Sequence, residues 1–77
     1  MIVTVNLTMK SGAALTVYHE PKSDKSIDIF EELNPSGARD AGHLMWFQFF
    51  RDKGKKGFTS VLMNEVAVIE IFREDNQ

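Results

Sequence analysis

Two histidines, His19 and His43, are the side chains of this 77-residue chain best suited to acid–base or metal chemistry near neutral pH. No His-x-x-x-His or comparable spacing would hold both on one face, so a metal site would also need carboxylates such as Glu20 or Asp40. The chain contains no cysteine and no Gly-x-Ser-x-Gly turn, either of which could supply an activated nucleophile. We therefore expect two surface or strand-end histidines, no catalytic residue, no metal site, no cofactor and no enzyme activity.

Carboxylates and glycines offer two further possibilities for chemistry. Asp28, Glu31 and Glu32 suggest a carboxylate pair for acid–base work, but adjacent residues of a helix point in different directions. We predict instead an acidic helix face in solvent. Gly54 and Gly57 flank lysines without the Walker spacing, so this stretch predicts a turn rather than a phosphate-binding loop.

The basic stretch 51–57 is the candidate for binding nucleic acid. Its cations are Arg51, Lys53, Lys55 and Lys56. Set against Asp52 they give +3, so the rest of the chain carries −5 to reach the net charge of −2. Phosphate contact by these cations, with Trp46 or a phenylalanine as a stacking platform, is one interpretation. A solvated turn is the favoured one, because the acidic remainder weakens attraction to phosphate.

The stretch 44–50 is the candidate for binding protein, since its aromatic residues alternate onto both faces of an expected strand. Leu44, Trp46 and Phe50 share one face, and Met45, Phe47 and Phe49 share the other. Two apolar faces are typical of a strand covered on both sides, by its own core or by a partner. We predict that Trp46, Phe47 and Phe49 contact another protein or a second copy of the chain.

Two hairpins are predicted from strand periodicity. Residues 2–18 alternate around Lys10-Ser11-Gly12, and a three-residue loop with Gly12 left-handed pairs Leu7 with Leu15 and Val5 with Val17. A two-residue turn would put half of the apolar side chains in water. The second hairpin turns through 51–57 and pairs Phe50 with Phe58 and Trp46 with Leu62.

One short helix is predicted between the hairpins. Ile27, Phe30 and Leu33 recur at helical spacing, Ser23 or Ser26 could cap the start, and Asn34-Pro35 ends the stretch. A strand is the alternative, but it would expose a phenylalanine. The small and polar residues 36–42 predict a loop.

Residues 66–72 resume the alternation as a final strand after a tight turn or bend at 64–65. The predicted fold is α+β and mainly β: a small antiparallel sheet or a partly open five-stranded barrel, with two hairpins, a C-terminal strand and the short helix. This strand rhythm resembles that of the Sm-like fold, which implies architecture alone because none of that group's nucleotide-contacting signatures is present. Neither 3–9 nor 66–72 contains a proline or an inward charge, so edge-to-edge joining of copies is a further hypothesis.

Composition limits the class of protein. A chain of 77 residues allows a single domain, 1–77, and with no cysteine its stability must come from burial of its 43% hydrophobic residues. The start lacks a basic, apolar signal and no run is long enough to span a bilayer, so we expect a cytoplasmic protein with a frayed polar tail at 73–77.

The expected function is therefore a non-enzymatic protein-binding or regulatory module. The alternative is a small β-barrel that binds nucleic acid through the 51–57 loop. Small size without catalytic motifs or cysteines is similar to the accessory proteins of phages and other mobile elements, many of which bind a host protein.

Overall fold

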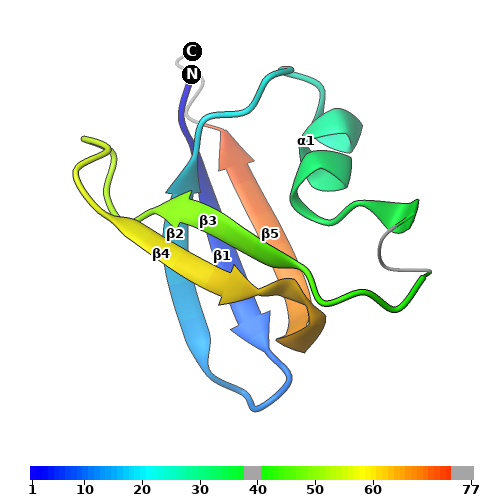
Figure 1. Ribbon diagram of the computed structural model, residues 1–77. Coiled ribbons are helices and arrows are strands. Elements are labelled where there is room, and N and C mark those ends of the chain that lie inside the picture. The colour runs from blue at the N-terminus through cyan, green and yellow to red at the C-terminus, as the bar shows by residue number, and fades with distance from the viewer. Residues whose placement is uncertain (38–40, 74–77) are drawn as a thin grey trace.

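The computed structural model describes residues 1–37 and 41–73, which form one open sheet of five antiparallel strands and a short α-helix (Figure 1). This confirms the mainly β fold predicted from periodicity. The elements along the chain are β1 (Val3–Met9), β2 (Ala14–His19), α1 (Ser26–Leu33), β3 (Trp46–Phe50), β4 (Phe58–Leu62), the 3-10 turn η1 (Met63–Glu65) and β5 (Val66–Arg73).

The strand order is β4-β3-β2-β1-β5, so β4 and β5 are the two edges of an open sheet. The chain passes from one edge to the other through η1 alone, and the sheet must therefore curl to bring its edges near each other. The predicted edge position of β1 is wrong, because β2 and β5 pair with it on either side. Arg73, expected in a frayed tail, is the last residue of β5; residues 74–77 lie outside the described part.

The first hairpin has the predicted register. Leu7 pairs with Leu15 and Val5 with Val17. The Met9 N–H donates to Ala13 O at 2.8 Å, and Gly12 has a φ of +97°, the left-handed conformation that this loop needs. Alternating residues of β1 therefore face the core together, as the hydrophobic period requires.

Helix α1 forms where predicted, and Leu33 of its predicted face is buried, but the prediction is wrong for Ile27 and Phe30. Ile29 and Leu33 are buried, whereas Ile27 and Phe30 are exposed. Glu32 lies one helical turn after Ile29, beside the buried face, and binds His19 of β2, which favours this orientation of the helix. The predicted serine caps are also wrong: Lys25 is the N-cap residue without a side-chain cap bond, and Ser23 Oγ donates to Asp28 instead.

The core lies between the curled sheet and α1 (Figure 1). Its fully or nearly fully buried apolar side chains come from β1, β2, α1, β3, β4 and η1: Val3, Val5, Leu7, Val17, Ile29, Leu33, Phe49, Val61 and Met63. Of the loop predicted at 36–42, Ser36 and Gly37 have helical backbone and 38–40 lie outside the described residues.

Candidate protein-binding surface

The β3–β4 hairpin separates its side chains into an inner and an outer set. Its register pairs Phe50 with Phe58 and Trp46 with Leu62, as predicted from the sequence. Because successive strand residues point to opposite faces, Phe47 and Phe49 face the core while Trp46 and Phe50 face away from it.

The inner set is part of the hydrophobic core. Phe49 has no exposed surface, and the Phe47 and Phe49 rings lie 4.7 Å apart. The His19 imidazole meets the Phe47 ring edge-on at 5.1 Å. One face of the aromatic strand is therefore covered by the protein itself.

The outer set forms what we call the outer strip: Leu44, Trp46, Phe50, Phe58 and Leu62. Leu44 is 73%, Trp46 65% and Phe58 56% exposed, and Phe50 and Leu62 are half-buried. Trp46 and Leu62 form one end, and the Phe50 and Phe58 rings, 5.5 Å apart, form the other. The polar pair Gln48 and Ser60 lies between them. Several large apolar side chains thus lie along one face of a single hairpin, which is typical of an interaction surface.

The basic loop 51–57 closes the hairpin at the phenylalanine end of the outer strip. Its backbone is ordered by the Arg51 N–H, which donates to Gly57 O at 2.9 Å, and by the Lys56 N–H, which donates to Asp52 Oδ1 at 3.1 Å. Lys55 has a φ of +62°, an uncommon conformation for a residue with a side chain. Arg51, Lys53, Lys55 and Lys56 are all exposed.

Lys55 is partly neutralised within the protein. Its Nζ donates to Glu20 Oε1 at 2.5 Å and lies 5.9 Å from the centre of the Phe50 ring. The hydrogen bond and positive charge of Lys55 lower the pKa of Glu20 below its ordinary value. The loop therefore offers less positive charge to a ligand than its sequence suggests.

The residues predicted to bind protein are separated by the fold. Trp46 is exposed on the outer strip, Phe47 is half-buried and Phe49 is fully buried. Phe58 and Leu62 were missed as candidates, although the predicted hairpin register had already placed them beside Phe50 and Trp46. Cross-strand pairing, read face by face, is the signal that could have found them.

His19 is the last residue of β2, the strand-end position predicted for it, but its side chain is buried and not on the surface. Its Nε2 lies 2.7 Å from Glu32 Oε2, and since a carboxylate only accepts, Nε2 carries the hydrogen. Glu32 Oε1 also accepts from the Lys22 N–H at 3.3 Å. This pair joins β2 to α1, so the prediction that Glu32 lies on a helix face in solvent is wrong. The second histidine, His43, is exposed.

The described residues, 1–37 and 41–73, were also considered as a metal site or a membrane span. Among them, no group of three or more His, Cys, Asp or Glu side chains is arranged to hold a metal ion. No helix in residues 1–37 and 41–73 has the length and apolar character needed to cross a bilayer. Comparison with family models, curated proteins and solved structures finds no match to this chain.

Proposed function

We propose that this protein is a non-enzymatic protein-binding module and that its partner docks on the outer strip. The supporting observation is Trp46, which pairs with Leu62 and is 65% exposed although the same strand buries Phe49 completely. A tryptophan in water contributes nothing to the core, whereas tryptophan is the residue most enriched among the contacts that dominate binding energy.

The charges around the outer strip indicate the chemistry of the partner. Arg51, Lys53 and Lys56 are exposed at the phenylalanine end, and the strip itself carries no charged side chain. A complementary partner presents apolar side chains to Trp46 and Phe58 and carboxylates to the loop. The edge of β4 beside the strip contains no proline or charge, so an extended partner segment could also pair with its backbone.

Helix α1 of the chain itself presents such a surface, with exposed apolar side chains next to carboxylates. Ile27 and Phe30 are exposed there, with Asp28 and Glu31 beside them. Self-association must therefore be measured first, as absolute mass by light scattering at low and high salt. A larger mass that Phe30→Ala abolishes would make a second copy the occupant of the strip, in place of a separate protein.

The direct test selects ligands from a displayed random-peptide library and measures the affinity of the selected peptides in solution. We expect sequences that combine apolar residues with Asp or Glu. Trp46→Ala is expected to weaken their binding about thirtyfold, the effect of losing a dominant interface contact of about 2 kcal/mol. Phe30→Ala is the matched control, since it removes an exposed aromatic from α1 on the opposite side of the sheet. Equal loss in both variants, or none in Trp46→Ala, would contradict the assignment of the strip.

A nucleic-acid-binding function is the second candidate, because four exposed cations lie in the loop that leads into the exposed Phe58. It predicts binding to single-stranded oligonucleotides that falls steeply with salt and is lost on replacing Lys53, Lys55 and Lys56 by Glu. Binding to the selected peptides through apolar contacts would change much less with salt. The salt dependence therefore separates the two functions.

A further inference from the structure

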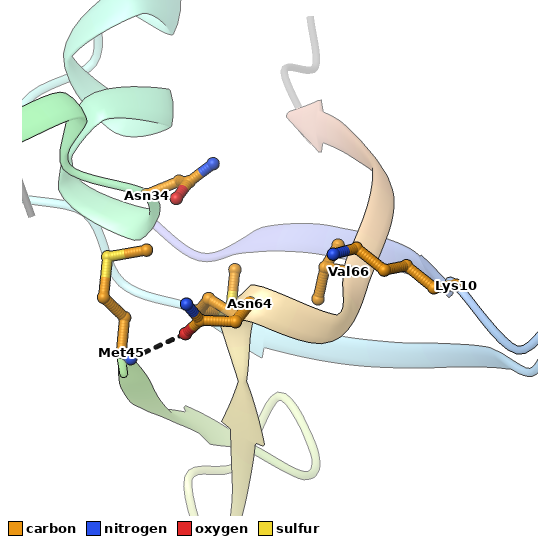
Figure 2. A pocket seen from close by; sticks show the side chains of 6 residues that line it. Lys10, Asn34, Met45, Asn64 and Val66 are labelled. Atoms are coloured by element: carbon orange, nitrogen blue, oxygen red, sulfur yellow. Dashed lines mark hydrogen bonds between the residues drawn. The ribbon is translucent and has the colours of Figure 1, made fainter. Parts of the chain in front are cut away.

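A recess lies at the start of β3, apart from the outer strip. It has a volume of about 240 Å³ and is lined by Lys10, Asn34, Met45, Met63, Asn64 and Val66 (Figure 2). These residues come from the ends of β1, α1 and β4 and from the starts of β3 and β5, so the fold alone brings them together. We refer to this recess as the Lys10 pocket.

Backbone and amide hydrogen bonds hold the walls of the Lys10 pocket in place. Asn64 Oδ1 accepts from the Met45 N–H at 2.8 Å, and its Nδ2 donates to His43 O at 3.0 Å. The Met63 N–H donates to Met45 O, and the Lys10 N–H donates to Glu65 O, each at 2.7 Å. The pocket is therefore formed before any ligand arrives, which reduces the entropic cost of binding.

The floor of the pocket is apolar and adaptable. Met63 is 4% exposed, and Met45 and Val66 are half-buried. Methionine side chains have three rotatable bonds and a polarisable sulfur, so they can adjust to apolar groups of different shape. The floor thus suits the hydrocarbon part of a ligand.

A single cation borders this floor. Figure 2 shows Lys10 extended past Val66 with its ammonium toward the middle of the pocket, and the Asn34 amide on the opposite side. Among the described residues, the ion pairs involve His19 with Glu32 and Lys55 with Glu20, and Lys10 is in neither. The Lys10 ammonium is thus available to an anion at the mouth of an apolar recess.

We propose that the Lys10 pocket binds a small carboxylate ligand, with the carboxylate on Lys10 and an apolar group on Met45, Met63 and Val66. Drug-sized ligands occupy sites of roughly 300–1,000 Å³, so this smaller volume accepts a short-chain acid or the last residue of a peptide. This assignment is independent of the outer strip, whose residues point to the other face.

The test uses hexanoate as the probe and follows the methionine methyl resonances by NMR. We expect titration to shift the Met45 and Met63 signals selectively, and the uncharged hexanamide to bind about tenfold more weakly because it lacks the charge-assisted bond. Acetyl-Leu-Leu with a free carboxylate, compared with its C-terminal amide, distinguishes a peptide terminus from a free acid as the source of the same chemistry. Selective binding of either acid supports the pocket.

Lys10→Met separates ligand binding from a merely structural role. Lysine stems also cover apolar surface, and Met keeps a similar stem while removing the charge. We expect Lys10→Met to keep the melting temperature and to lose about tenfold in hexanoate affinity, whereas Lys22→Met, an exposed lysine outside the pocket, loses none. Equal affinity of Lys10→Met and the unaltered protein, or no methionine shift at saturating hexanoate, would overturn the proposal.

Discussion

The contact between His19 and Glu32 gives a prediction whose magnitude can be worked from the structure. Glu32→Ala removes the acceptor of the His19 Nε2–H and of the Lys22 N–H. A buried donor left without an acceptor costs about 1–3 kcal/mol, and because the Glu32 side chain is 24% and His19 11% exposed, we expect the lower part of that range, about 1–2 kcal/mol. For a domain of this size that corresponds to a melting temperature lower by about 4–16 °C.

The assay is thermal unfolding followed by circular dichroism, with urea unfolding as a second measure. Glu32→Gln should retain most of the stability, because an amide oxygen still accepts from His19. Glu70→Ala, which truncates an exposed carboxylate on β5, should change the free energy of unfolding by less than about 0.5 kcal/mol. A Glu32→Ala protein that melts within about 2 °C of the unaltered one would refute this account of how α1 is held.

Three further predictions concern the core, the first hairpin and the loop. Phe49→Ala should lower the free energy of unfolding by about 3–5 kcal/mol in urea titration, whereas Trp46→Ala should change it by less than about 1 kcal/mol, since Phe49 is buried and Trp46 exposed. Gly12→Ala should cost about 1 kcal/mol in the same assay, because its φ of +97° strains a residue with a Cβ. Lys55→Met should raise the pKa of Glu20 toward its ordinary value, which an NMR titration of its carboxyl carbon measures.

The sign of the Glu20 effect follows from the lowered pKa. A carboxyl group with a lower pKa in the folded state stabilises the protein above its unfolded pKa, and that stabilisation is lost as the pH falls through the folded pKa. Lys55→Met should therefore flatten the acid side of the stability profile and leave stability below the folded pKa unchanged. A deeper loss of stability in acid for Lys55→Met would contradict the assigned partner.

Local sequence was sufficient to predict both hairpins. The period of two, the three-residue loop and the left-handed Gly12 determine the pairing of Leu7 with Leu15, and similar reasoning pairs Phe50 with Phe58. The alternation fixes the register, because a slip of one residue would turn a whole set of apolar side chains toward water. The class of fold follows from the same alternation.

The candidate site was predictable only in part. The sequence identified β3 as a strand with two apolar faces, but Trp46 and Phe49 look alike from composition and spacing. Which face meets the core depends on where α1 packs and how the sheet curls. The Lys10 pocket had no sequence signal, since its lining comes from four separate stretches of the chain.

The sequence by itself determined the strands, their turns and the presence of one short helix, because these depend on near neighbours and on a single periodicity. Tertiary structure decided which apolar face was buried wherever two were available. In α1, Ile27 and Phe30 compete with Ile29 and Leu33 for the core, and the hydrogen bond from His19 to Glu32 orients the helix toward the second pair. In β3, the same choice leaves Trp46 in water, since a small core can bury only one side of its sheet.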